Sequence, residues 1–323
     1  MKKSNRAFPF LMAGVSMLAW GASASAYDLY VNASNTTGTE DGTEANPFNT
    51  IGEAVTAAAA LSGQPSIFIA NGTYAEGVDI ESPIKLLGAS KNGVIIDASG
   101  QKMGISIDAD SDIEKLTVKK GFYGIYVSEN SSADINDVKI KESEDTGVQI
   151  SKGSTRDSKK VTLKDSEISD SEGKGMYIQK RKIDIQNNEI KNNNEEGIDI
   201  RAGVRGTIKK NTITDNEEGG IEVILGSTKL KITSNKIRGN KASGINSQFY
   251  KENKKVGDVT VSKNKISNND KYGLNCQAPS GGDPIKGYWQ KSITLLKNIF
   301  SGNDKNYAGV CKFEEAKKIT SKK

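Results

Sequence analysis

The stretch from Ile183 to Ile200 reads IDIQNNEIKNNNEEGIDI, and its pattern recurs along the chain. Two apolar residues alternate with polar ones, an amide pair and a single isoleucine follow, and a glycine then opens a second alternating segment. The step from isoleucine to glycine is seven residues in six copies: Ile140–Gly147, Ile168–Gly175, Ile190–Gly197, Ile213–Gly220, Ile237–Gly244 and Ile266–Gly273. The glycines are 28, 22, 23, 24 and 29 residues apart. A fixed unit with joints of variable length predicts a solenoid of stacked repeats.

The alternation predicts β-strands in each repeat, because a period of two places apolar side chains on one face of a strand. A helical repeat would show a 3.6-residue apolar stripe, and none is present. A leucine-rich repeat has a similar first phrase, but its second segment is a helix or a longer apolar run. Here the second segment returns to alternation. We therefore expect roughly nine to ten turns of parallel strands, about 4.8 Å apart, in a rod about 45 Å long.

Two asparagine positions recur at the corners of these turns. The first file consists of Asn188, Asn211, Asn235, Asn264 and Asn298. The second consists of Asn193, Asn216, Asn240, Asn269 and Asn303, with Ser143 and Ser171 at the same place in earlier turns. Asparagine tolerates left-handed backbone, and its amide can both donate and accept along a stack. We interpret both files as structural ladders that satisfy corner backbone groups.

Residues 1–26 are typical of a secretory signal peptide. Lys2, Lys3 and Arg6 precede an apolar run from Phe8 to Trp20, and the segment ends in the small residues ASA. We expect a secreted or periplasmic product with no membrane span. Its predicted parts are an entry strand and capping helix over 27–65, a parallel β-helix over 66–311 and a basic tail over 312–323.

The composition excludes several classes of chemistry. The chain has no histidine, which rules out Ser-His-Asp and Cys-His nucleophile systems and the common zinc sites. Removal of the signal peptide leaves 42 basic and 40 acidic residues, a net charge of +2. No concentrated basic stripe accompanies this charge, so a nucleic-acid partner is not predicted.

The two cysteines, Cys276 and Cys311, lie at similar points of the last two repeats. Stacked turns would bring them within bonding distance, and an oxidising compartment favours a disulfide that ties down the C-terminal end. Longer joints interrupt the repeats at 151–160, 248–258 and 277–292. The last joint carries Tyr288 and Trp289, which either form a binding wall over one face or cover a sheet edge.

The chain resembles the pectate lyase-like superfamily of right-handed parallel β-helix proteins over nearly all of its length. Its N-terminal segments YDLYVN (27–32), DGTEANPFNTIGEA (41–54) and IFIANGTY (67–74) are similar to the opening of many secreted members. Thr50 and Glu53 form a capping-box pattern ahead of an apolar stripe from Ile51 to Leu61, which predicts a helix that covers the open end of the solenoid. The expected fold is all-β: a single-stranded right-handed parallel β-helix with an N-terminal capping helix.

If the isoleucines point inward, the middle residue of each Gly-apolar-x-apolar phrase points outward along one continuous sheet. That file is Tyr126, Gln149, Tyr177, Asp199, Glu222, Asn246 and Asn275, and the file two residues further along is Ser128, Ser151, Gln179, Arg201, Ile224 and Gln248. Tyrosine rings stack on sugar faces, and Arg201, Lys180 and Lys182 would meet uronate carboxylates. The expected saccharide-binding residues are Tyr126, Gln149, Tyr177, Gln179, Lys180, Lys182 and Arg201.

Several members of the superfamily are polysaccharide lyases or epimerases that use an Arg or Lys base with Ca²⁺. The resemblance implies Arg201 as the base, Tyr177 as the proton donor to the leaving oxygen, and Asp199 and Glu222 as Ca²⁺ ligands. The paired Asp-Asp of the hydrolases and the signatures of the better-known calcium-dependent lyases are missing. We prefer to interpret Asp199, Arg201 and Glu222 as an exposed ladder of cross-turn ion pairs, and the glutamates of the joints as solvated turn residues.

Three functions therefore stay open. The missing catalytic signature favours a monomeric protein that binds polysaccharide, or another cell's glycan, along the exposed sheet. The alternatives are a lyase or epimerase that acts on an anionic glycan, and a purely structural exported solenoid.

Overall fold

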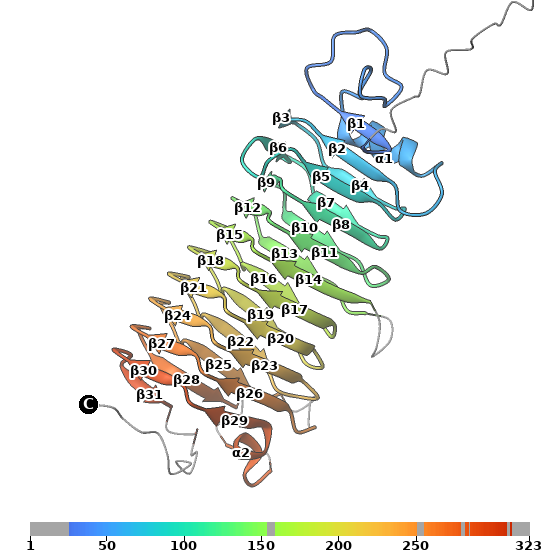
Figure 1. Ribbon diagram of the computed structural model, residues 1–323. Helices are drawn as coiled ribbons and strands as arrows, with labels where there is room; N and C mark the ends of the chain where they lie inside the picture. The colour runs from blue at the N-terminus through green and yellow to red at the C-terminus, as the bar shows by residue number, and fades with distance from the viewer. Residues whose placement is uncertain are drawn as a thin grey trace, which may run out of the picture.

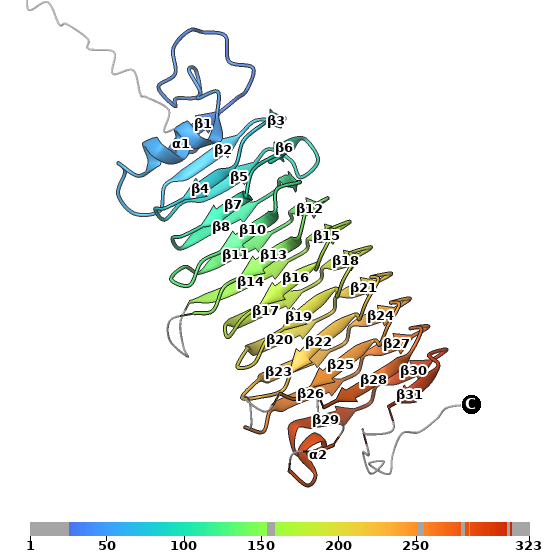
Figure 2. The ribbon, with the colours of Figure 1, turned by 180° about the vertical axis from the view of Figure 1, so that it is seen from behind.

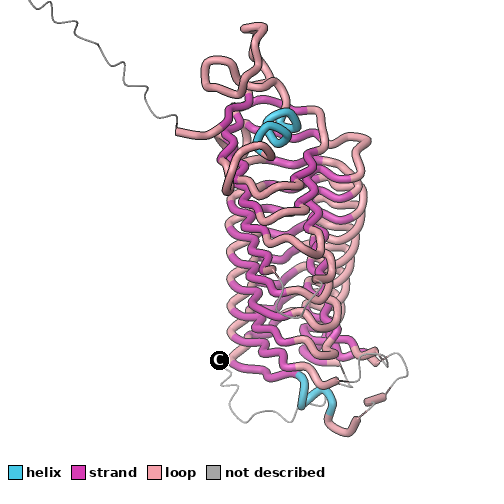
Figure 3. Tube along the Cα trace, turned by 90° about the vertical axis from the view of Figure 1, so that its right-hand side faces the viewer, coloured by secondary structure: helices cyan, strands magenta, loops and turns pink. Residues whose placement is uncertain are grey.

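The chain winds into a rod-shaped parallel β-helix in the computed structural model, which describes residues 26–153, 159–250, 255–278, 282–283, 285–308 and 311 (Figure 1). Most turns give one strand to each of three sheets along the rod, as the tube in Figure 3 shows. In the described residues the sheets contain eleven, ten and ten strands, all paired in parallel. The predicted all-β solenoid is confirmed. The expected signal peptide and basic tail lie outside the described residues, apart from Ala26.

Sheet A contains β1 (Leu29–Val31), β2 (Ser66–Ile69), β5 (Lys85–Gly88), β8 (Ser111–Glu114), β11 (Ala133–Asn136), β14 (Lys160–Lys164), β17 (Lys182–Gln186), β20 (Arg205–Lys209), β23 (Lys229–Thr233), β26 (Asp258–Ser262) and β29 (Ile293–Leu296). Sheet B contains β3 (Gly72–Tyr74), β6 (Val94–Asp97), β9 (Thr117–Lys119), β12 (Lys139–Lys141), β15 (Glu167–Ser169), β18 (Glu189–Lys191), β21 (Thr212–Thr214), β24 (Lys236–Arg238), β27 (Lys265–Ser267) and β30 (Ile299–Ser301). Sheet C contains β4 (Val78–Ile80), β7 (Met103–Ile107), β10 (Tyr123–Val127), β13 (Thr146–Ile150), β16 (Met176–Ile178), β19 (Ile198–Ile200), β22 (Ile221–Ile224), β25 (Ile245–Gln248), β28 (Tyr272–Gln277) and β31 (Lys305–Tyr307).

The core is a set of apolar columns inside the coil. The repeated isoleucines, among them Ile168, Ile190 and Ile213, are completely buried. Each such side chain contributes roughly 2 kcal/mol of burial free energy relative to exposure. The glycine seven residues later is required by close packing and not by a left-handed backbone: a Cβ on Gly197 would lie 2.7 Å from Ile213 Cγ2 and 2.8 Å from the Gly220 carbonyl oxygen.

Both asparagine files form continuous hydrogen-bonded ladders. Asn211 donates from Nδ2 to Asn235 Oδ1 and to the Ile185 carbonyl, each at 3.0 Å. Its own Oδ1 accepts from the backbone nitrogen and the Nδ2 of Asn188, at 2.9 and 3.0 Å. The second file is built alike at the corner that leads into sheet C, with Asn216 Nδ2 2.9 Å from Asn240 Oδ1. Each amide is thus satisfied by the turns next to it, which a buried polar group requires.

A short helix covers the N-terminal end of the coil. Helix α1 (Ile51–Ala58) begins with a capping box, since the Thr50 side chain accepts from Glu53 N and the Glu53 carboxylate accepts from Thr50 N. Ile51, Val55 and Ala58 are buried against the first turns, where α1 contacts β1, β2 and β4. The apolar stripe ends there, because Leu61 lies past the helix with 45 % of its surface exposed.

The opposite end is closed by a helix and a disulfide. Helix α2 (Tyr288–Ser292) packs on β26 and β29 of sheet A, with the Tyr288 and Trp289 side chains buried and the Tyr288 ring 4.7 Å from that of Phe249. Of the two alternatives for this joint, these rings therefore cover a sheet edge. The predicted disulfide between Cys276 and Cys311 is present, with the Cα atoms 5.3 Å apart.

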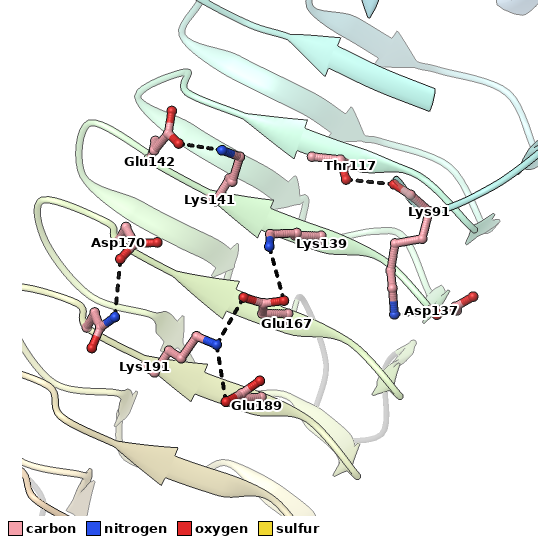
Figure 4. A network of polar contacts seen from close by, with 11 residues as sticks. Lys91, Thr117, Asp137, Lys139, Lys141, Glu142, Glu167, Asp170, Glu189 and Lys191 are labelled. Atoms are coloured by element: carbon pink, nitrogen blue, oxygen red, sulfur yellow. Dashed lines mark hydrogen bonds and ion pairs between the residues drawn. The ribbon is translucent and has the colours of Figure 1, made fainter. Parts of the chain in front are cut away.

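Sheet B carries interleaved charges on its outer face. Lys139 and Lys191 both lie 3.2 Å from the Glu167 carboxylate, and Lys191 also meets Glu189 at 3.2 Å (Figure 4). Such exposed pairs contribute less than about 1 kcal/mol each. They solubilise this face and leave no cation or carboxylate of the group without a partner.

Candidate functional site

The outward file of sheet C, here called the strip, is formed by Tyr126, Gln149, Tyr177, Asp199, Glu222, Asn246 and Asn275. The strand register aligns these residues one above another on consecutive strands from β10 to β28. Neighbouring members are therefore separated by the strand spacing of about 4.8 Å. The strip follows the rod axis on the sheet that contains β10, β13, β16, β19 and β22 (Figure 2).

The upper end of the strip is aromatic. The rings of Tyr123 and Tyr126 are stacked, with centroids 6.1 Å apart and planes at 22°. Phe122 meets Tyr123 edge-on at 4.9 Å and is 41 % exposed. Ser151 Oγ donates to the Tyr126 hydroxyl at 2.9 Å and fixes that ring. A flat, half-exposed set of rings of this kind suits the apolar face of a sugar.

Arg201 lies between two tyrosine rings in the middle of the strip. Its guanidinium carbon is 5.9 Å from the ring centroids of both Tyr177 and Tyr250. Arg201 follows the end of β19, its Nη1 is 3.7 Å from Asp199 Oδ1 on that strand, and its side chain is 36 % exposed. Cation–π contact with two rings holds the planar guanidinium in place while leaving donors free. No pattern in the sequence pointed to Tyr250, which belongs to the joint that begins at residue 248.

Below Arg201 the strip is acidic and buried. Only 2 % of Asp199 and 8 % of Glu222 are exposed. Burial raises the pKa of Asp199 to about 6 and that of Glu222 to about 7, against the attraction of Arg201. Glu222 Oε2 accepts from Asn246 Nδ2 at 2.9 Å and from Gln248 Nε2. The expected exposed, cross-turn ion ladder is therefore wrong: both carboxyls are buried, and Arg201 pairs with Asp199 of its own turn.

A second acidic layer adjoins the strip at the corner that leads into sheet C. Lys174 Nζ contacts Glu195 and lies 3.5 Å from Glu196 Oε2. A hydrogen bond with Glu196, followed by burial, raises the pKa of Glu218 to about 7. Glu196 is only 7 % exposed, so its interpretation as a solvated turn residue is wrong. The spacing Glu195-Glu196-Gly197 places it directly before the buried glycine, which was the signal available in the sequence.

The two acidic layers border a depression of about 370 Å³ on the sheet C face. Its lining includes Glu196, Glu218 and Glu222 on one side and Lys241, Asn246 and Lys271 on the other. Asn275 Nδ2 donates to Asn246 Oδ1 at 2.9 Å and continues the amide floor. The arrangement offers hydrogen-bond donors, acceptors and two cations to a polyhydroxylated ligand.

Some predicted site residues lie away from the strip. Lys182 opens β17 and aligns with Lys160 and Arg205, so it belongs to sheet A and not to the groove. Lys180 lies at the corner between the two sheets, where its side chain packs beside Gly203. Gln179 stays with the strip, its Nε2 3.4 Å from the Tyr177 hydroxyl. Ile224, placed in the second outward file, is buried.

The donor set does not fit the expected Ca²⁺ site. In the described part of the chain no three acidic, histidine or cysteine side chains converge to hold a metal ion. Asp199 Oδ1 faces the Arg201 guanidinium, and one Glu222 oxygen is taken by two amide donors. A calcium ion requires six to eight oxygen ligands.

The chain belongs to the family described as the right handed beta helix region. The model of this family matches residues 92–253 and 154–322. No curated protein matches by sequence. Similar solved structures include the pectate lyase Pel9A, which is 17 % identical in sequence and has a TM-score of 0.61. The match covers 87 % of this chain and 76 % of that chain. An alginate lyase from Paenibacillus sp. str. FPU-7 has 15 % identity and TM-score 0.59, with 80 % and 96 % covered. The A-module of the Azotobacter vinelandii mannuronan C-5 epimerase AlgE4 has 14 % identity and TM-score 0.53, with 86 % and 97 % covered.

At these identities the likeness defines the fold. Among the described helices none is long and apolar enough to cross a membrane.

Proposed function

We propose that this protein binds a polysaccharide along the strip, with the glycan lying parallel to the rod axis. The observation that carries the proposal is the position of Arg201 between Tyr177 and Tyr250, in line with the stacked rings of Tyr123 and Tyr126. Tyrosine rings, the guanidinium of Arg201 and amide side chains thus follow one another along the strip, separated by the spacing of successive strands. This is the combination that recognises sugar faces, carboxylates and hydroxyls.

In this proposal different residues of the strip contact different groups of the polysaccharide. Tyr126 and Tyr177 offer ring faces, Gln149, Gln179 and Asn246 offer amide groups, and Arg201 offers a bidentate donor to a carboxylate. The disulfide supports an oxidising compartment, in keeping with export. It supports a location in a periplasm or outside the cell, and we propose that the protein acts there as a monomer.

Electrophoresis through gels that contain single polysaccharides tests this proposal. The panel should contain neutral and anionic polymers, and retardation measures the affinity. Tyr177→Ala and Arg201→Gln should each weaken retardation on the order of tenfold. Tyr27→Ala, whose ring stacks on Phe68 of sheet A, and Arg238→Gln on sheet B are matched controls and should behave as wild type. Equal retardation of Tyr177→Ala and wild type would exclude the strip, and a panel without any retardation would leave the purely structural role.

A second candidate function is proton transfer on an anionic glycan. The observation that favours it is the pair of raised pKa values, about 6 for Asp199 and about 7 for Glu222, next to Arg201. A protonated Glu222 can donate to a substrate carboxylate, Arg201 would act as the base, and Tyr177 would donate to the leaving oxygen. In this candidate Arg201→Ala abolishes turnover and leaves the thermal midpoint nearly unchanged.

Absorbance of new unsaturated ends detects a lyase, and NMR of solvent proton exchange into the product detects an epimerase. Both should be followed on uronate polymers near pH 7, with the binding panel as reference. Retardation without either signal supports the binding function. Either signal, lost in Arg201→Ala, supports the enzyme.

A further inference from the structure

Sheet A carries a column of cations that the linear sequence does not reveal. Lys160, Lys182, Arg205 and Lys229 are aligned in register on the consecutive strands β14, β17, β20 and β23. Each cation opens its strand and is exposed or half-exposed, whereas the apolar residue that follows it on β14, β17 and β23 is buried, so the four side chains point outward. Their spacing along the rod is therefore the strand spacing of about 4.8 Å. The column ends at Asp258, which aligns with Lys229.

The column is short of counter-charge. Lys160 lies 3.4 Å from Asp184, but in the described residues no ion pair involves Lys182, Arg205 or Lys229. The same outer face adds Lys164, Lys209 and Lys231 on β14, β20 and β23. On sheet B, by contrast, the lysines of β12 and β18 are interleaved with glutamates.

Like charges on neighbouring strands of one face repel and destabilise the sheet. At the ionic strength of the cell the screening length is about 8 Å, which exceeds the spacing of the column. The repulsion is therefore present in the free protein and would be relieved by an anionic chain laid along the column. A linear polymer with regularly spaced charges fits a straight file better than a compact anion does.

We propose that the sheet A column binds a linear anionic polysaccharide, on a surface separate from the strip. The outward file beside the cations contains Thr162, Asp184 and Thr207, and Gln186 lies in the next file. The hydroxyls and the amide suit sugar hydroxyls, and Asp184 is 3.4 Å from Lys160. No outward side chain of the described strands β14, β17, β20 and β23 is aromatic. Single-stranded nucleic acid is normally held by stacking on such rings, so the surface favours a polysaccharide. The polymer's charges are carboxylates or sulfates.

The test measures retention of the full protein on alginate, on dextran sulfate and on a single-stranded DNA oligonucleotide, at low salt and at 0.5 M NaCl. The variant Lys182→Gln/Arg205→Gln/Lys229→Gln should bind the anionic polysaccharide on the order of tenfold to a hundredfold more weakly. The control Lys102→Gln/Lys115→Gln/Lys152→Gln removes the same charge from scattered sites and should retain binding. Alginate and dextran sulfate distinguish carboxylate from sulfate recognition.

Arg205→Glu separates a binding role from a structural one. A glutamate between Lys182 and Lys229 should raise the thermal midpoint, because it replaces repulsion by attraction, and should weaken retention on the polyanion. In a Tyr177→Ala background the column variant should lose retention by the same further factor, so failure of the strip proposal would not affect the outcome. Equal losses in the column variant and the scattered control would overturn the proposal, as would the absence of wild-type retention at low salt. Tighter binding of the oligonucleotide than of either polysaccharide would overturn the assignment to a polysaccharide.

Discussion

The strip on sheet C and the column on sheet A are both files of side chains on stacked parallel strands. They differ in the burial and the pairing of their charged side chains. On sheet C, Asp199 and Glu222 are buried, hydrogen-bonded or ion-paired within the protein, and have raised pKa values. On sheet A, Lys182 and Lys229 are exposed and are not ion-paired within the described residues. Both files have the register of stacked strands. Burial, and not the repeat itself, decides whether a file of charges is neutralised internally or offered to a ligand.

The asparagine ladders provide the largest expected effects. Asn211→Ala and Asn216→Ala each remove one amide from a buried ladder and leave donors and acceptors of the adjacent turns unpaired, at a cost of about 4 kcal/mol in unfolding free energy. Asn216 precedes the glutamates beside the strip, whereas Asn211 follows the end of β20. Urea unfolding should give similar losses, while gel retardation should weaken at the strip for Asn216→Ala and at the column for Asn211→Ala. Loss of the same binding in both variants would contradict this separation.

The disulfide should affect sheet C more than sheet A. It joins β28 to Cys311, just beyond β31, whereas the last sheet A strand, β29, is covered by α2. Cys276→Ser with Cys311→Ser should lower the stability of this end by about 3 kcal/mol. Amide hydrogen exchange should accelerate in β28 and β31 and stay slow in β29. Equal acceleration in β29 would show that the two sheets open together at this end.

Glu222→Gln measures the energetic cost of a buried acid in the strip. The pKa of Glu222 is raised from an ordinary 4.5 to about 7, so folding favours its protonated form. Below about pH 4.5 the carboxyl is protonated in both states, and the wild type then loses stability as the pH rises through 7. The variant should be more stable than wild type by on the order of 2 kcal/mol at pH 8, with little difference at pH 4. Thermal unfolding of both proteins between pH 4 and pH 8 measures this difference, with a variant of the exposed Glu217, Glu217→Gln, as control. A stability difference that is the same at all pH values would contradict the prediction.

Salt should give the smallest effect and should act on the column. Screening of the repulsion among Lys182, Arg205 and Lys229 should stabilise the wild type by a few tenths of a kcal/mol between low salt and 0.5 M NaCl. Arg205→Glu should lose stability over the same range, because there salt screens an attraction. An identical salt response in the two proteins would mean that the column stores no repulsion.

The register of the fold could be predicted from the fixed step between isoleucine and glycine. That step aligns Tyr177 with Asp199 and Asp199 with Glu222, as the strand pairing has them. The corner of the neighbouring turn was harder to locate: β16 ends at Ile178 and β17 begins at Lys182, so three residues carry the chain to another sheet. The prediction that Lys182 lies in the groove is therefore wrong, because Lys182 is close to Tyr177 in the sequence but belongs to another sheet.

The basic column was not predicted because its members are far apart in the chain. Lys160, Lys182, Arg205 and Lys229 are separated by 22, 23 and 24 residues, so no single window of sequence contains the column. In a solenoid, residues one turn apart are neighbours, and charge has to be summed along that period. The burial of Asp199 was not predicted either, because the alternation in the sequence places its side chain on the outer face of the sheet and does not show what covers that face.

The amide ladders have a consequence for the evolution of this molecule. Each asparagine donates to the amide oxygen of the following turn and accepts the same kind of bond on its own amide oxygen from the preceding turn, so a copied or deleted turn would find its hydrogen bonds already matched. The length of the β-helix can then change by whole turns without any change in the hydrogen bonds of the corners. The number of binding positions along either face is free to follow the length of the polymer it encounters.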